Sequence, residues 1–224
     1  MMHKVERLAA KLTAIVSSWP GVESVVSCEA SETDVLDPYF ALVLDVYCYG
    51  SIPSSEERQS LFENPGAFET SQSGDKDRFF IDELPIHLEY KRTRTIEDLV
   101  ANSFDSMWAV GGSGTYFIYR IVNGKKLFAK SDWLERMRGA LADSPAEFWM
   151  RLRETSQQKM EHSLSDLGGA ALKDDRFFYF VSLAGFMRSC ASAIFAFNRQ
   201  WEPSDRHMTG AHMSLPSLAD DFQG

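Results

Sequence analysis

The first 130 residues combine two hydrophobic periods, which predicts helices mixed with strands. Residues 3–18 place their apolar side chains on one face of a helix, and Pro20-Gly21 ends it. Residues 22–28 (VESVVSC) and 39–49 (YFALVLDVYCY) are rich in β-branched and aromatic residues, which is typical of strands. The pattern predicts a third strand centred on residues 86–90.

Turn and capping signals divide the rest of this region. Ser54 with Glu57 forms a capping box, which predicts a short helix. Residues 64–77 (NPGAFETSQSGDKD) have the composition of a loop, and Thr95 is the expected cap of a helix through residue 104. Residues 111–130 are expected to form a β-hairpin: an aromatic strand, a turn at Asn123-Gly124 and a return strand.

Only helical patterns follow Lys130. Ser144 is the expected N-cap of a helix that starts with Pro145, runs to about Leu164 and is broken by residues 167–169 (LGG). A long apolar helix is expected from about residue 174 to residue 201. The predicted fold class is therefore α+β: a mixed sheet with flanking helices in residues 1–130, then an all-α helical-bundle domain in residues 131–224.

The apolar segment 177–197 is long enough to suggest a membrane span. Arg188 lies at its centre, and a central arginine makes insertion unfavourable, so we expect a buried core helix and no membrane association. The N-terminal residues include Glu6 and have no apolar core, which is not the pattern of a signal peptide.

Composition narrows the expected partners and compartment. The 224 residues carry a net charge of −9, which excludes a broad basic surface for duplex nucleic acid. Cys28, Cys48 and Cys190 have no metal-ligand spacing and lie in apolar segments, so we expect reduced, buried thiols in a cytoplasmic protein.

Asp45 is the residue that most needs an explanation, because a buried carboxylate is costly unless it is paired. On the later strand His87, Glu89 and Lys91 share one face, as alternate residues do. If the two strands are neighbours, Asp45 and Glu89 meet and could hold a hard cation such as Mg²⁺. Two alternatives remain open: an ion pair of Asp45 with Lys91 or an arginine, and a mononuclear metal site for hydrolysis that includes His87.

Two other segments have simpler interpretations. Residues 111–114 (GGSG) resemble a phosphate loop but precede an expected strand, so a flexible turn is favoured. The basic cluster 91–94 (KRTR) could contact phosphates, but a solvated strand end is the simpler interpretation.

The order of these elements resembles the nucleotidyltransferase superfamily of the polymerase-β type. It is similar to small bacterial members with a helical second domain, such as the kanamycin and lincosamide nucleotidyltransferases. Residues 116–138 (YFIYRIVNGKKLFAKSDWLERMR) resemble the family's paired strands leading into the helical domain. Residues 193–208 (AIFAFNRQWEPSDRHM) resemble a signature of that domain.

The resemblance implies transfer of a nucleoside monophosphate from ATP or another NTP to a hydroxyl acceptor, with Mg²⁺ or Mn²⁺ as cofactor. It assigns Asp45 and Glu89 to catalysis and metal binding. It places Ser31 and Lys91 near the phosphates, and Asn198 and Arg199 on the acceptor side. The expected partners are a nucleotide and a small-molecule or protein acceptor, with a homodimer left open.

The chain departs from the family pattern at two positions. Tyr47 stands where the second carboxylate of the Asp-x-Asp motif belongs, and Ala30-Ser31 stands near the expected Gly-Ser turn. The alternative function is therefore a catalytically degenerate module that keeps the fold and binds a nucleotide or a partner. Burial of Asp45 against a basic side chain, with Tyr47 filling the cleft, would favour this alternative.

Overall fold

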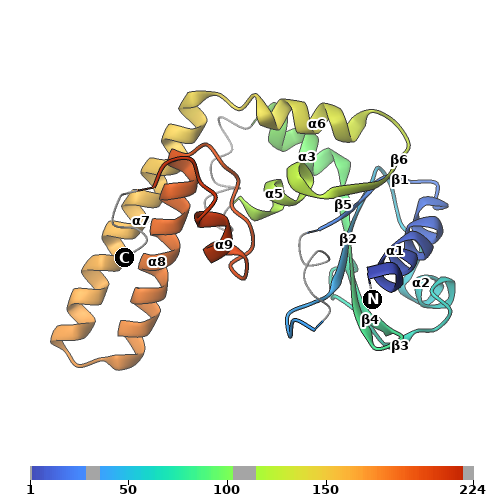
Figure 1. Cartoon of the computed structure of the whole chain (residues 1–224), viewed down its shortest axis with the longest axis horizontal. Helices are drawn as coiled ribbons and strands as arrows, with labels where there is room; N and C mark the ends of the chain where they lie inside the picture. Colours follow the sequence, from blue (N-terminus) through green and yellow to red (C-terminus); the bar gives the residue numbers. More distant parts are fainter. Residues whose placement is uncertain (1, 29–35, 103–114, 219–224) are drawn as a thin grey trace. The chain divides into compact units, whose positions relative to one another are not determined.

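The computed structural model describes residues 2–28, 36–102 and 115–218. The chain divides into two compact units (Figure 1). The first comprises Met1–Ala101 and Arg120–Ala142, and the second Asn102–Tyr119 and Asp143–Gly224. The sequence placed a single boundary at residue 130, whereas α6 (Trp133–Ala142) packs against α3 (Thr93–Ala101) of the first unit.

The first unit is built on a six-stranded mixed sheet with the order β3-β4-β5-β2-β1-β6. The central strands β2 (Leu42–Cys48) and β5 (Leu84–Arg92) are parallel, and every other pairing is antiparallel. The strands β1 (Val22–Ser27) and β2 are buried throughout. This mixed sheet with flanking helices, followed by an all-helical region, confirms the predicted fold class.

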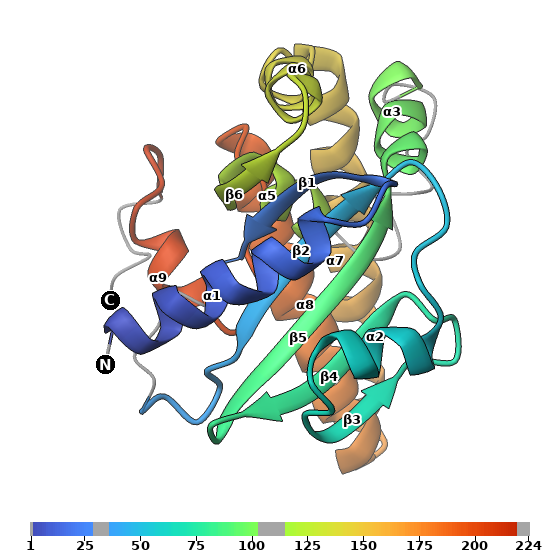
Figure 2. The ribbon, with the colours of Figure 1, turned by 90° about the vertical axis from the view of Figure 1, so that its right-hand side faces the viewer.

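The two faces of the sheet are chemically different because side chains alternate along each strand. One face is apolar and packs with α1 (Met2–Ser17), which crosses the sheet in Figure 2. Its core includes Leu12, Leu44, Val46 and Leu88. Asp45 lies between two of these residues in sequence, so its side chain falls on the opposite face.

A hairpin occupies the segment expected to be a loop. β3 (Gly66–Thr70) pairs with β4 (Lys76–Ile81), and β4 pairs with β5. The loop prediction for residues 64–77 is wrong because glycine and serine residues form the turn of this hairpin, while Phe68 and Phe79 stack in the core. The capping box of α2 (Ser55–Leu61) is confirmed.

In the described part of the predicted hairpin at residues 111–130, the first strand is wrong and the return strand is present. Tyr116–Asn123 is a helix, α5, while the return segment forms β6 (Lys125–Ala129) and pairs with β1. The aromatic composition favoured a strand, but the apolar spacing also suits a helix whose Ile118 and Ile121 are buried. Helix α3 begins at Thr93, two residues before the expected cap.

The second unit is centred on a pair of packed helices, α7 (Ala146–Leu172) and α8 (Arg176–Phe197), followed by the short α9 (Met208–His212). The predicted break at Gly168-Gly169 is wrong, because α7 continues through both glycines. The N-cap of α7 is Pro145, not Ser144, and Asp175 caps α8 through Phe178 N at 3.0 Å.

Helix α8 is less buried than the sequence suggested. Within the described residues it is the one helix long and apolar enough to cross a membrane, and 28% of its most apolar 18-residue stretch is buried. The prediction of a buried core helix is therefore wrong. Length and composition alone are weak evidence for a membrane span.

Candidate functional site

Asp45 and Glu89 are direct neighbours across the two central strands. In the parallel pairing of β2 with β5 their Cα atoms are register partners. Both side chains lie on the sheet face opposite α1, where Tyr47 and Lys91 follow two residues later on their strands. The structure thus brings together the two carboxylates that the sequence placed on separate strands.

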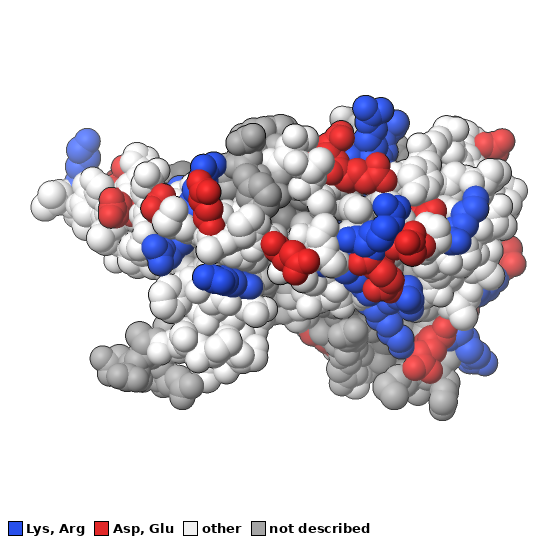
Figure 3. All heavy atoms as spheres, turned by 90° about the horizontal axis from the view of Figure 1, so that it is seen from above, with Lys and Arg blue, Asp and Glu red and all other residues white. Residues whose placement is uncertain are grey.

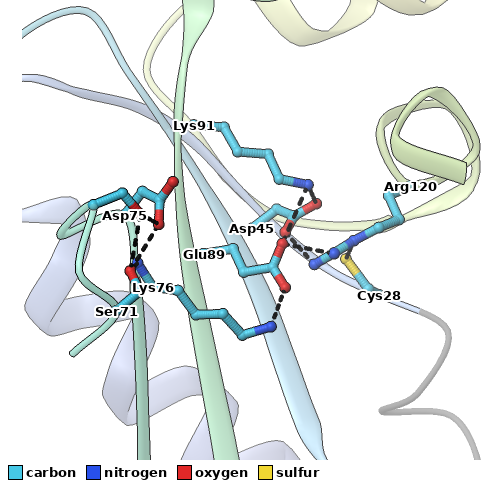
Figure 4. A network of polar contacts seen from close by, with 9 residues as sticks. Cys28, Asp45, Ser71, Asp75, Lys76, Glu89, Lys91 and Arg120 are labelled. Carbon is cyan, nitrogen blue, oxygen red and sulfur yellow. Dashed lines mark hydrogen bonds and ion pairs between the residues drawn. The ribbon is translucent and has the colours of Figure 1, made fainter. Parts of the chain in front are cut away.

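Three basic side chains neutralise this carboxylate pair, and Figure 4 shows them converging on it. Arg120 bridges the carboxylates: Nη1 donates to Glu89 Oε2 at 2.7 Å, and Nη2 donates to Asp45 Oδ1. Lys91 Nζ donates to Asp45 Oδ2 at 2.7 Å, and Lys76 Nζ donates to Glu89 Oε1 at 2.8 Å. All four carboxylate oxygens therefore accept from a cation.

The electrostatics of the cluster follow from these contacts. Burial alone would raise the pKa of Glu89, but the charges of Arg120 and Lys91 and the hydrogen bond from Lys76 outweigh it and lower that pKa from 4.5 to about 2. Glu89 is therefore ionised throughout the physiological pH range. Two negative and three positive groups leave the cluster with a net charge of +1.

Apolar and weakly polar groups seal the Asp45 side of the cluster. Asp45 and Tyr47 have no exposed surface. The Tyr47 ring packs against that of Trp133, with 5.3 Å between the ring centroids. Burial and the charge of Asp45 raise the pKa of Tyr47 well above its usual range, so its hydroxyl stays protonated and faces Asp45 Oδ2 at 3.5 Å. The same two causes raise the pKa of Cys28 to about 12, and Arg120 Nε donates to its sulfur at 3.3 Å.

The end of α5 sets the position of Arg120. Arg138 of α6 donates to the carbonyl of Ile121 in the last turn of α5 and to that of Gly124, the residue after the helix. A Cβ atom at Gly124 would lie 2.5 Å from the carbonyl oxygen of Arg120 and 3.2 Å from that of Ser27. Only glycine allows α5 to turn this closely into β6.

The residues present do not fit the divalent cation that the family resemblance implies. A dication would enter a cluster that is already net positive, and would have to displace arginine or lysine from each carboxylate oxygen that it binds. The described residues contain no group of three or more His, Cys, Asp and Glu side chains that could hold a metal ion. The hydrolase alternative, which included His87, therefore has no such ligand group among the described residues.

The other predicted site residues are distributed as follows. Lys91 belongs to the ion-pair cluster, whereas Ser31 lies outside the described residues. Asn198 caps α8 and fixes Ser217: its Nδ2 donates to the Ser217 carbonyl at 2.9 Å and its Oδ1 accepts from Ser217 N at 2.8 Å. Arg199 is exposed with a φ of 53°. Their acceptor-side role stays a prediction.

Sequence reasoning missed Arg120 and Lys76. Arg120 is almost completely buried in an apolar segment, and a lone arginine among apolar residues was a signal that it has a carboxylate partner. Lys76 was assigned to a loop, so its place on β4 opposite Glu89 was not foreseen.

The face of the molecule seen in Figure 3 shows basic and acidic side chains interspersed over the first unit. The whole chain likewise contains many residues of both signs: 23 lysine and arginine residues and 32 aspartate and glutamate residues, which give the net charge of −9.

No family model matches the chain, and no curated protein matches it. Among solved structures, the chain is similar to a nucleotidyltransferase-like protein from Exiguobacterium sibiricum 255-15. The two share 10% sequence identity with a TM-score of 0.46, over 98% of this chain and 69% of that chain. This likeness concerns the fold alone, so the functional argument rests on the residues of this chain.

Proposed function

We propose that this chain is a non-catalytic module with a nucleotidyltransferase-like fold, in which the metal-ligand positions carry a structural ion-pair network. One observation carries the proposal: Asp45 is completely buried, and both of its oxygens accept hydrogen bonds from basic side chains. A carboxylate that holds Mg²⁺ for a triphosphate must instead be open to the substrate. The module acts by binding a partner, not by transferring a nucleotide.

The position of Tyr47 supports the same conclusion. The family motif would have a second carboxylate here, on the same strand face as Asp45. In this chain the position is filled by a buried phenol that packs on Trp133. The aromatic pair takes the space and removes the charge that a second metal ion would require.

Metal-dependent nucleotidyl transfer is the second candidate, and the strand register favours it. Asp45 and Glu89 are register partners on adjacent parallel strands, as two carboxylates of one site would be. In this candidate Lys76, Lys91 or Arg120 would release the carboxylates when NTP and metal bind, with Mg²⁺ or Mn²⁺ as cofactor.

Calorimetric titration of each of the four NTPs, with and without Mg²⁺ or Mn²⁺, separates the two candidates. The proposal predicts no metal-dependent binding. It also predicts that Asp45→Asn lowers the free energy of unfolding by about 3–5 kcal/mol, because the buried Arg120 loses one of its two carboxylate partners and the cluster gains an uncompensated positive charge. The control Asp82→Asn removes an exposed carboxylate and should change stability by less than about 0.5 kcal/mol.

A working metal site at Asp45 would give the opposite result in the same titrations. Metal-dependent NTP binding by the wild type that is lost in a stable, folded Asp45→Asn variant would overturn the proposal. It would assign Asp45 to a working metal site, because binding that requires both the metal ion and the Asp45 carboxylate, in a variant that stays folded, is the behaviour of a metal ligand.

A further inference from the structure

Helix α8 presents an apolar stripe to solvent along the side that does not pack on α7. Phe177, Phe180 and Met187 are 80%, 67% and 63% exposed, and Ala184 lies between them. Their spacing of three, four and three residues places all four on one side of the helix. The buried residues of α8, such as Ser182 and Ser189, lie on another side.

The exposure continues at the end of the hairpin where α7 joins α8. Leu172, the last residue of α7, is almost fully exposed, and Leu164, about two turns earlier, is half-exposed. Among the described elements of this unit, only α7 and α8 themselves form this end (Figure 1). The stripe Phe177, Phe180, Ala184 and Met187, with Leu164 and Leu172, is called the hairpin surface below.

From this arrangement we infer that the hairpin surface binds the hairpin surface of a second copy of the chain, forming a homodimer through a four-helix arrangement. Alternating spacings of three and four residues are those of the a and d positions in paired helices. A two-fold axis brings the same patch on two copies together, so an apolar stripe of this kind is complementary to itself.

The exposed area is of the size that a dimer needs. From usual side-chain areas, the hairpin surface exposes on the order of 600 Å² of apolar area. One partner of a standard interface contributes about 800 Å², while the largest apolar patch on a typical monomer is about 300–600 Å². The hairpin surface is thus at the upper limit for a monomer and supplies most of one side of an interface.

The charges on α8 favour a protein partner over a lipid bilayer. Its two charged residues, Arg176 and Arg188, each pair with an aspartate of the same chain, at 3.8 Å for Asp174 and 3.0 Å for Asp205. A helix partner can leave these exposed pairs in water at the rim. A bilayer would have to bury Arg188 near the centre of the apolar segment.

Sedimentation velocity of the full chain over a wide range of concentrations tests the inference. We expect a dimer of twice 25.3 kDa. The double variant Phe177→Glu/Phe180→Glu should weaken dimerisation by about thirtyfold or more, as expected when central aromatic contacts are lost. The control Phe80→Glu changes a half-exposed phenylalanine on β4 and should leave the dimer intact.

A second measurement keeps the test decisive if the double variant fails to fold. Ala184→Cys, in a Cys190→Ser background, places a thiol at the middle of the stripe, where the two-fold axis is expected. Oxidation should give a disulfide-linked dimer, whereas Gly139→Cys on the exposed side of α6 in the same background should not.

Three outcomes would overturn the inference: a monomer at every concentration, a dimer that survives the double variant, or an equal effect of Phe80→Glu. Flotation of the monomeric protein with phosphatidylcholine–phosphatidylglycerol vesicles, lost in the double variant, would assign the hairpin surface to a membrane instead. The inference is independent of nucleotide binding, so a failure here leaves the proposed function unaffected.

Discussion

Arg120 in the last turn of α5 forms a buried ion pair with Asp45 at the centre of β2, 75 positions earlier in the chain. The same guanidinium reaches Glu89 on β5, so a single side chain joins the two central strands to α5. The planar guanidinium donates to the two carboxylates from two different nitrogens held in a fixed geometry, which the single nitrogen of a lysine does not reproduce. This bridge is the structural centre of the polar face of the sheet.

The first prediction concerns the coupling of Arg120 with Asp45. Either Arg120→Met or Asp45→Asn should cost about 3–5 kcal/mol of unfolding free energy, because each removes one member of the buried pair and leaves the other with a single charged partner. The double variant should cost clearly less than the sum of the two, and urea denaturation of the four proteins measures the coupling. Additive effects would show that the pair does not contribute as a unit.

The second prediction is a pH dependence that belongs to Glu89. Its pKa is lowered from 4.5 to about 2, so its contribution to stability is fully present above about pH 4.5 and is lost as the pH falls toward 2. The size of the shift corresponds to on the order of 3 kcal/mol. Denaturation of wild type and Glu89→Gln at several pH values should show a stability difference that shrinks across this window.

The matched control for this pH dependence is Glu135→Gln, which changes an exposed glutamate of α6. Its stability difference from wild type should stay small at every pH. A Glu89→Gln difference that stays constant between pH 5 and pH 2 would contradict the assignment of the low pKa to Glu89.

The third prediction concerns the turn from α5 into β6. Gly124→Ala should destabilise the protein by about 1–3 kcal/mol, because the new methyl group meets the carbonyl oxygen of Arg120. Gly139→Ala on α6 has open space around the new Cβ and should stabilise it by about 0.5–1 kcal/mol. Thermal unfolding of both variants checks the signs; equal effects would contradict the close approach at Gly124.

The fourth prediction concerns a second buried ion pair on the apolar side of the sheet. Arg58 of α2 donates to both oxygens of Asp77 at 2.7 and 2.8 Å, and the Tyr90 hydroxyl donates to Asp77 at 2.6 Å. Asp77→Asn should cost about 3–5 kcal/mol and Tyr90→Phe about 1–2 kcal/mol, as measured by urea denaturation.

Arg58→Lys separates the geometry of this pair from its charge. A lysine keeps the positive charge but cannot bind the carboxylate with two parallel hydrogen bonds. Arg58→Lys should therefore lose most of the unfolding free energy that Asp77→Asn loses. Full stability in Arg58→Lys would show that the charge alone is sufficient. The variants Asp77→Asn, Tyr90→Phe and Arg58→Lys change no residue of the Arg120 cluster. Their effects on stability should therefore add to those of the first prediction.

The periodic pattern was sufficient where one hydrophobic period dominated a segment. The helix at the N-terminus, the strand carrying Asp45, the strand carrying Glu89 and the capping box at Ser54 were all foreseen within a few residues. It failed where composition and period disagreed. Aromatic residues favoured a strand over Tyr116–Asn123, and glycines favoured a break within α7, but tertiary contacts decided for helices in both places.

The sequence by itself determined which residues face the same side of a strand, and therefore that Asp45 and Glu89 carry their carboxylates away from the apolar core. This follows from the two-residue repeat of β-structure, which is a local property of the backbone. Only the tertiary structure decided what those carboxylates contact. The pairing of β2 with β5 and the return of Arg120 from α5 depend on long-range contacts, which no local pattern encodes.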